Sequence, residues 1–231
     1  APHTMSTSII KDRKLEIVHS QYELISKVTL LQLAILRKLF AGPFDEELFE
    51  EADTNEHVID RLEIRIREEV AYTIYMFAPK AEDLRRIIAY PDLTTNLERV
   101  GDMVMNGVYI ARDLDFTSDF MHEYARRLLQ MLDDTTEMIR SAIISFSTMD
   151  TEVAHQVIDA DDNIDRQQRE IIQLITAEGA DRVHSEAEIL ALLQIHTVAH
   201  NLERIGDSAT NLAESTIYLV EGTDVRHEFE E

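Results

Sequence analysis

The residues of this chain best suited to chemistry are carboxylates spaced four positions apart. Pairs of the form Glu/Asp-x-x-x-Asp stand at Glu56/Asp60, Glu98/Asp102, Asp161/Asp165 and Glu203/Asp207. On a helix, side chains four positions apart lie about 5–6 Å from each other on one face, so each pair brings two like charges together. A cation between them turns this repulsion into coordination, and oxygen ligands suit Mg²⁺, Ca²⁺ and Mn²⁺. These pairs are therefore candidate metal ligands.

An internal duplication places the pairs at corresponding positions. Residues 96–102 read Asn-Leu-Glu-Arg-Val-Gly-Asp, and residues 201–207 read Asn-Leu-Glu-Arg-Ile-Gly-Asp. The same offset of 105 residues aligns residues 56–61 with residues 161–166, and Asp45 with Asp150. Three landmarks that share one offset without gaps indicate two copies of a single unit.

The elements that must position these side chains are helices. Hydrophobic residues make up 45% of the chain and aromatic residues 6%, with six Gly and four Pro, which favours helix over turn-rich structure. The expected helices span residues 11–40, 45–77 and 80–113 in the first copy, and residues 117–147, 150–178 and 185–220 in the second. Short connections should make them antiparallel. The expected fold class is all-α: two tandem three-helix bundles, up-down-up as in spectrin repeats.

Ordinary helix-stop and helix-start residues mark the boundaries. Gly42-Pro43, Pro79 and Gly179 are expected breaks, and Asp150 and Ser185 are expected N-caps. Pro91 falls inside the third expected helix, where its ring should kink or break it.

The domain boundaries follow from these elements. The first repeat is placed at residues 5–115, the second at residues 116–222, and a C-terminal tail at residues 223–231. Residues 1–4, before Met5, read as a remnant of recombinant expression. Because the link between the copies is short and not rich in Pro, Gly or Ser, the two bundles should share an interface.

The third helix of the second copy predicts how the carboxylates face. At 100° per residue, one apolar arc contains Leu190, Val198, Leu202, Ile205, Ala209 and Leu212. The opposite stripe contains His196, His200, Glu203, Asp207, Asn211 and Glu214. The corresponding first-copy stripes contain Asp53, Glu56, Asp60 and Glu63 on one helix, and Glu98, Asp102 and Asn106 on the other. On such an exposed face we expect nothing to perturb the carboxylate pKa values.

Two other features accompany the stripe. Gly101 and Gly206 lie mid-helix at equivalent positions, where Gly costs about 1 kcal/mol relative to Ala. Close helix packing is one explanation, and access for a ligand beside the neighbouring Asp is the other. His200, Asn106 and Asn211 are candidate additional ligands, whereas His196 and His200 match no zincin or ferritin-like motif.

Charge and composition exclude several classes of function. The net charge of −23 argues against nucleic acid, whose phosphates need Lys and Arg. The absence of Cys removes disulfides and thiol chemistry. The most apolar stretch, residues 28–36, is too short to span a bilayer, and no secretory signal follows Met5. A soluble, cytoplasmic protein is expected. No phosphate loop or nucleophile motif points to an enzyme.

The doubled motif at residues 96–102 and 201–207 resembles the PhoU family of phosphate-transport (phosphate uptake) regulators. Residues 79–85, Pro-Lys-Ala-Glu-Asp-Leu-Arg, and residues 217–227, Ile-Tyr-Leu-Val-Glu-Gly-Thr-Asp-Val-Arg-His, add to the resemblance. It covers nearly the whole chain from about Lys11. The second copy departs from the pattern, because it has Glu188-Ile189-Leu190 in place of Asp-Leu-Arg.

The resemblance implies a non-enzymatic negative regulator of phosphate uptake. It implies metal clusters held by Glu56, Asp60, Glu98, Asp102, Asp161, Asp165, Glu203 and Asp207. Iron or zinc is the first expectation for the metal, with manganese or magnesium next. The implied partners are the phosphate ABC transporter ATPase and a sensor histidine kinase, with contact to the membrane only through them. A homodimer is also implied.

The residues themselves leave alternatives open. One is a structural bundle whose carboxylate stripes are only solvated, and another is a regulator of a different transporter. A third is a metal-dependent hydrolase of phosphate esters, in which Asp102 and Asp207 would be essential. Met103 and Met105 of the first copy correspond to Ser208 and Thr210 of the second, so the two sites are expected to differ in affinity.

Overall fold

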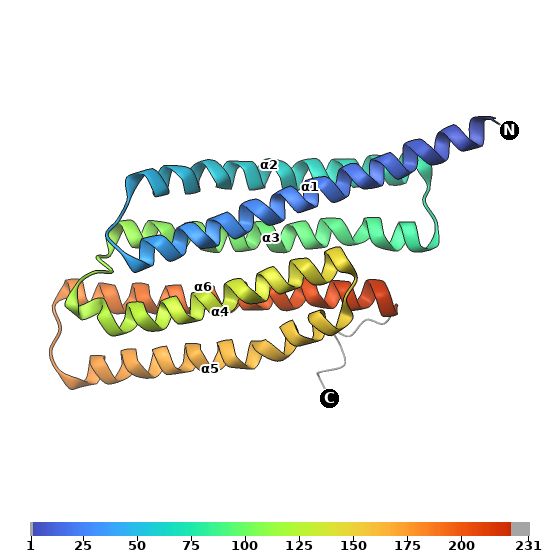
Figure 1. Cartoon of the computed structure of the whole chain (residues 1–231). Coiled ribbons are helices and arrows are strands. Elements are labelled where there is room, and N and C mark those ends of the chain that lie inside the picture. The colour runs from blue at the N-terminus through green and yellow to red at the C-terminus, as the bar shows by residue number, and fades with distance from the viewer. Residues whose placement is uncertain (1, 223–231) are drawn as a thin grey trace.

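Six long helices build the molecule, as the computed structural model shows (Figure 1). It describes the backbone of residues 2–222 and the side chains of residues 9–80 and 82–222. The helices are α1 (Pro2–Ala41), α2 (Glu46–Phe77), α3 (Ala81–Asp113), α4 (His122–Thr148), α5 (Thr151–Asp181) and α6 (Glu186–Glu221), with a short 3-10 helix, η1 (Asp119–Met121), before α4. The all-α prediction is confirmed. The expected tail, residues 223–231, lies outside the described residues.

The predicted helix starts carry side-chain caps. Asp150 accepts hydrogen bonds from the backbone N–H groups of Glu152 and Val153, at 3.0 and 3.1 Å. Asp45 caps α2 in the same way, as the duplication requires. Ser185 forms a capping box with Glu188 at the start of α6. These caps satisfy N–H groups that have no partner inside the helix.

Three boundaries and one predicted break differ from the expectation. Helix α5 continues through Gly179 to Asp181 instead of ending at residue 178, so the predicted break at Gly179 was wrong. Helix α1 begins at Pro2 rather than Lys11, since Pro is tolerated in a first helical turn. The fourth helix begins later than expected, because the Asp115 side chain accepts from the N–H and hydroxyl of Thr117 and forms a turn there. Helix α3 does not break at Pro91 but continues to Asp113. Neighbouring Tyr90 and Leu93 are buried, so packing on both sides of the proline keeps α3 in place.

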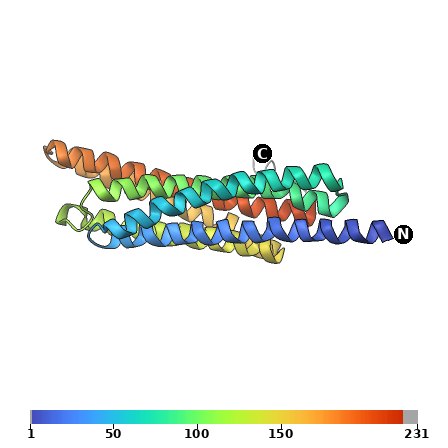
Figure 2. The same ribbon diagram turned by 90° about the horizontal axis from the view of Figure 1, so that it is seen from above.

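The helices form two bundles, α1–α3 and α4–α6, whose long axes run along one common direction (Figures 1 and 2). Helix α1 packs on α4 and α3 packs on α6, so the bundles share an interface and one continuous core. Tyr22 of α1, Tyr90 of α3 and Phe146 of α4 meet there with ring centroids 5.0–5.7 Å apart. Edge-to-face packing of this kind stabilises beyond the area that it buries.

Candidate metal centres

The seam between α2 and α3 brings the first set of predicted carboxylates together. Asp60 of α2 and Asp102 of α3 lie close enough to Glu56 of α2 and Glu98 of α3 to raise the pKa of both glutamates. Glu56, Asp60 and Glu98 are partly buried, while Asp102 is exposed. We call these four residues the first carboxylate cluster.

Burial and mutual repulsion make ionisation of this cluster unfavourable. Burial, followed by the hydrogen bond and charge of Asp102, raises the pKa of Glu56 to about 8. Burial, followed by the charges of Asp102 and Glu63, raises the pKa of Glu98 to about 7. Desolvation disfavours the charged form of a carboxyl, and a neighbouring negative charge acts in the same direction. The cluster therefore attracts protons or other cations.

The seam between α5 and α6 holds an equivalent second carboxylate cluster: Asp161, Asp165, Glu203 and Asp207. Burial, followed by the charges of Asp165 and Asp207, raises the pKa of Asp161 to about 6. Burial, followed by the charge of Asp207, raises the pKa of Glu203 to about 7. The pKa of Asp207 also rises through burial and the charge of Asp165, although the hydrogen bond with Glu203 and the charges of Arg204 and His200 oppose the shift.

The expectation of unperturbed carboxylates on an exposed face was wrong. The stripes lie at helix seams, where the neighbouring helix covers part of each side chain, so Glu203 remains only 20% exposed. A 100° projection gives the direction of each side chain but not how far a neighbouring helix extends over it. The same limit applies to Leu190, assigned to the apolar arc, which is 56% exposed near the start of α6.

Each cluster contains a buried carboxylate oxygen without a hydrogen-bond partner. These atoms are Glu56 Oε2 and Asp161 Oδ1, at equivalent positions of the two copies. Buried polar atoms are nearly always hydrogen-bonded, and an unpaired one in a carboxylate cluster is consistent with a missing cation. The donors present, all carboxylate oxygens, suit hard divalent cations.

The two mid-helix glycines make room for these same oxygens. A Cβ at position 101 would stand 3.1 Å from Glu56 Oε2 and 3.2 Å from Ile59 Cδ1. A Cβ at position 206 would stand 3.5 Å from both Asp161 Oδ1 and Ile164 Cγ2. Both explanations for the glycines therefore apply, since each lies against the neighbouring helix and beside a cluster carboxylate.

The carboxylate oxygens of the clusters are thus suitable ligands for a cation, but the side chains in their present rotamers do not surround one. Among the described side chains, no three His, Asp or Glu residues form a group arranged to hold a metal ion. Coordination would therefore require rotation of these side chains within each seam.

The additional ligand candidates have other surroundings. Asn201 Nδ2 donates to Asn106 Oδ1 at 2.7 Å, and Asn211 Nδ2 donates to Asn96 Oδ1 at 3.2 Å, across the interface between α3 and α6. His200 is the imidazole beside the second cluster, with Nδ1 3.9 Å from Glu203 Oε2 and 53% of its side chain exposed. The sequence placed Asn106 and Asn211 on the stripes as candidate ligands, but it did not show that they pair with Asn201 and Asn96 across this interface.

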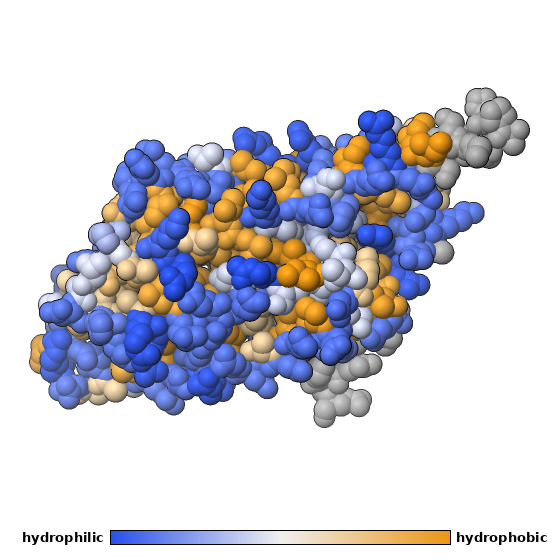
Figure 3. Space-filling view, in the orientation of Figure 1, coloured by the Kyte–Doolittle hydropathy of each residue, from blue (hydrophilic) through white to orange (hydrophobic). Residues whose placement is uncertain are grey.

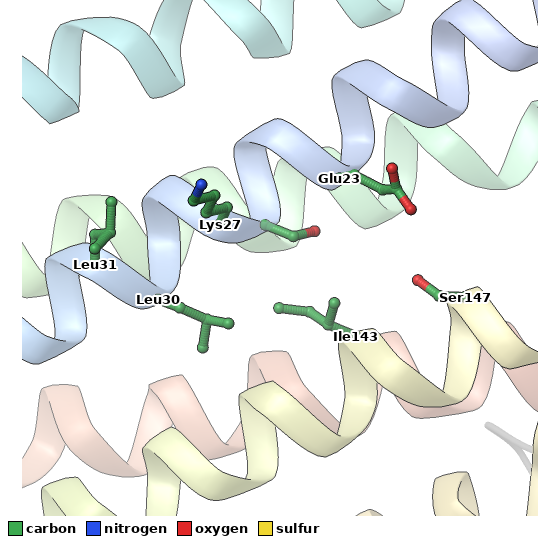
Figure 4. A pocket seen from close by; sticks show the side chains of 7 residues that line it. Glu23, Lys27, Leu30, Leu31, Ile143 and Ser147 are labelled. Atoms are coloured by element: carbon green, nitrogen blue, oxygen red, sulfur yellow. The ribbon is translucent and has the colours of Figure 1, made fainter.

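A larger surface groove lies away from both clusters. It has a volume of about 410 Å³ and runs between α1 and α4, beside Leu30, Leu31 and Ile143 (Figure 4). In the space-filling view, hydrophobic residues gather across the middle of the face that Figure 1 shows (Figure 3). Its lining contains one carboxylate, Glu23, and no histidine, so it offers fewer metal ligands than either cluster.

Comparison with known proteins agrees with the doubled architecture. A family model described as "PhoU domain" matches residues 22–111 and again residues 128–216. A relative named "Phosphate-specific transport system accessory protein PhoU homolog" from Burkholderia sp is 34% identical over 176 residues, which are 75% of this chain and 73% of the relative. One of the same name from Pseudomonas putida is 30% identical over 183 residues, 79% of this chain and 70% of the relative.

Solved structures agree as well. The crystal structure of PhoU from Pseudomonas aeruginosa matches with a TM-score of 0.84 and 25% identity, covering 92% of this chain and 99% of that one. The phosphate transport system regulatory protein PhoU from Streptococcus pneumoniae matches with a TM-score of 0.77 and 21% identity, which supports the fold. With two matched copies that cover most of its length, the chain belongs to the PhoU domain family.

Proposed function

We propose that this chain is a non-enzymatic negative regulator of phosphate uptake that works as a metal-binding adaptor. Its relatives are named as accessory proteins of the phosphate-specific transport system. In this role the chain would link the phosphate ABC transporter ATPase to a sensor histidine kinase at the cytoplasmic side of the membrane. No helix in residues 2–222 has the length and hydropathy needed to cross a bilayer, so attachment to the membrane through partners is consistent with the described part.

The observation that carries the metal-binding part is the pair of unsatisfied carboxylate oxygens, one in each cluster. Glu56, Asp60, Glu98 and Asp102 would hold metal in the first copy, and Asp161, Asp165, Glu203 and Asp207 in the second. A bound cation would neutralise the repulsion that raises their pKa values and fix α2 to α3 and α5 to α6. Iron and zinc are the metals that family resemblance favours, whereas oxygen donors alone favour manganese or magnesium.

The net charge of −23 supports docking on basic partner surfaces. Metal at the seams would change both the local charge and the rigidity of the helices that carry it. We therefore expect partner binding to depend on metal loading. The family resemblance adds the expectation that a homodimer is the functional unit.

Metal content is the first test. The protein is purified without chelator, and its metals are measured by mass spectrometry for wild type, Glu98→Gln/Asp102→Asn and Glu203→Gln/Asp207→Asn. The control is Glu68→Gln/Asp159→Asn, which changes two exposed carboxylates outside the clusters by the same charge. Each cluster variant should lose the metal of its own copy while the control keeps both. Equal metal in all four proteins, or none after incubation with iron, zinc, manganese and magnesium, would contradict the metal sites.

The regulatory role is tested in cells that lack their own relative of this chain. Wild type should restore repression of a phosphate-controlled reporter when phosphate is plentiful. It should also retain the transporter ATPase and the sensor kinase in a pull-down, and a chelator should weaken both interactions. A chain that binds metal but neither represses nor retains these partners would exclude the adaptor role.

A further inference from the structure

A pocket of about 310 Å³ lies between α3 and α6, at the interface of the two copies, with Met103 as an apolar part of its lining. Arg99, Asp102 and Asn106 line it from α3, and Thr197, Asn201 and Arg204 line it from α6. Most of these side chains are exposed, so the pocket is open to solvent. Two guanidinium groups in one pocket are notable in a chain with 22 basic and 45 acidic residues.

Neither arginine is neutralised by a neighbouring acid. Arg99 and Arg204 have no carboxylate oxygen within 4.0 Å among the described side chains, whereas Arg37, Arg126 and Arg127 each form such an ion pair. Arg204 comes near enough to Asp207 to lower the pKa of that carboxyl, but it forms no ion pair with it. Both guanidinium groups are thus available to an external anion.

The duplication explains why the two arginines meet. They occupy equivalent positions of the two copies, in the repeated Asn-Leu-Glu-Arg sequence. Asn201 of α6 pairs with Asn106 of α3, and the later Asn211 pairs with the earlier Asn96. The two helices are therefore antiparallel, with a register that these two hydrogen bonds define. This register places Arg99 and Arg204 at the same pocket.

The lining also selects the kind of anion. A guanidinium donates paired hydrogen bonds to an oxyanion, and the Thr197 hydroxyl adds a further donor. Asp102, in contrast, can only accept a hydrogen bond while it is ionised, so it favours an anion that carries a proton and repels one that does not. At pH 8 inorganic phosphate retains one proton, whereas sulfate has none and a phosphomonoester, with a second pKa near 6, is fully ionised.

We propose that this pocket binds inorganic phosphate, held by Arg99 and Arg204 and distinguished from other oxyanions by Asp102. Asp102 also belongs to the first carboxylate cluster, and the two oxygens of a carboxylate offer about four acceptor positions, enough for both contacts. Phosphate bound here would touch a cluster residue and tie the two copies together. The biological meaning of such a site rests on the proposed function, while the binding itself is measured independently of it.

Isothermal titration calorimetry at pH 8 tests the site, with inorganic phosphate, sodium sulfate and glycerol phosphate as separate ligands. Wild type is compared with Arg99→Gln/Arg204→Gln. The control, Arg61→Gln/Arg169→Gln, removes the same charge from exposed arginines that do not line the pocket. Each protein is titrated after treatment with chelator and after loading with metal, and circular dichroism confirms its fold.

Wild type and the control should bind inorganic phosphate saturably, and the double variant at least tenfold more weakly. Sulfate should bind wild type at least tenfold more weakly than phosphate, and Asp102→Asn should reduce that difference. Tighter binding of glycerol phosphate would support the pocket but assign it to a phosphorylated molecule. Absence of saturable phosphate binding in both metal states, equal affinity of the double variant, or equal affinity for sulfate would overturn the proposal. The metal content of the same samples reports on the proposed function separately.

Discussion

Replacing Glu203 by Gln tests the partly buried position of the second cluster without requiring any ligand. Glutamine has the shape of a protonated glutamate, so the substitution preserves packing and removes only the ability to ionise. Burial and the charge of Asp207 raise the pKa of Glu203 to about 7. At alkaline pH the ionised Glu203 of the metal-free wild type is therefore repelled by Asp207, and the variant lacks this repulsion.

The size of the effect follows from this pKa. A rise from 4.5 to about 7 corresponds to at most ~3.4 kcal/mol, at ~1.36 kcal/mol for each pKa unit. Because 20% of the side chain still faces water and the shift is shared with Asp207, solvent screening reduces this to about 1.5 kcal/mol. In a protein of this length that corresponds to an increase in Tm of roughly 3–6 °C.

The sign depends on pH in a defined way. Below pH 4.5 the carboxyl is protonated in both the folded and the unfolded chain, so the variant and wild type should be equally stable. Between pH 4.5 and pH 7 the unfolded chain releases a proton that the folded chain retains, and wild type loses stability relative to the variant. Above pH 7 the difference should stay constant.

Thermal unfolding by circular dichroism, in chelator and from pH 4.5 to pH 8.5, measures this difference. Glu68→Gln is the matched control, since Glu68 is exposed and outside both clusters. A Glu203→Gln variant that is no more stable than wild type at pH 8.5, or whose gain does not change with pH, would show that the cluster is fully solvated.

Four further outcomes are expected. Gly206→Ala should raise the free energy of unfolding by about 0.5–1 kcal/mol in denaturant titrations, because the new Cβ meets its neighbours at ordinary distances. Gly101→Ala should raise the free energy of unfolding by less, since its Cβ crowds Glu56 and Ile59, and a larger increase at 101 than at 206 would contradict this. Asp150→Ala should lower the free energy of unfolding by about 1 kcal/mol in the same assay, because two backbone donors of α5 lose their acceptor. The metal affinity of the first cluster should keep rising up to about pH 8, because the metal competes with the proton that Glu56 releases over this range. An affinity that does not change above pH 6 would exclude this competition.

Much of the fold could be predicted from the sequence, because its signals are local. Asp150 and Ser185 were recognisable as caps from residue type alone, and the structure confirms both. The constant offset between the copies then transferred each assignment from one bundle to the other. Pro91 misled the prediction, because a proline weakens a helix locally while burial of its neighbours depends on distant parts of the chain.

The candidate site was predictable in its residues but not in its environment. Helical spacing was enough to group Glu203 with Asp207, and the duplication linked them to Glu98 and Asp102. How deeply the seam covers them depends on the packing of two helices, which periodicity does not contain. The pairing of Arg99 with Arg204 was hidden for the same reason, since it depends on the antiparallel register of α3 and α6.

The two clusters are alike in position but not in ionisation, which follows from what duplication preserves. Glu56 corresponds to Asp161, and the longer side chain carries its carboxyl into a more strongly perturbed position, with a pKa of about 8 against about 6. The space beside the neighbouring glycine is correspondingly smaller: a Cβ at position 101 would stand 3.1 Å from Glu56 Oε2, whereas one at position 206 would stand 3.5 Å from Asp161 Oδ1. At neutral pH Glu56 therefore retains its proton more than Asp161 does. Under the proposed metal binding, a cation at the first cluster competes with that proton, so a change in pH would load the two copies unequally although they present the same motif.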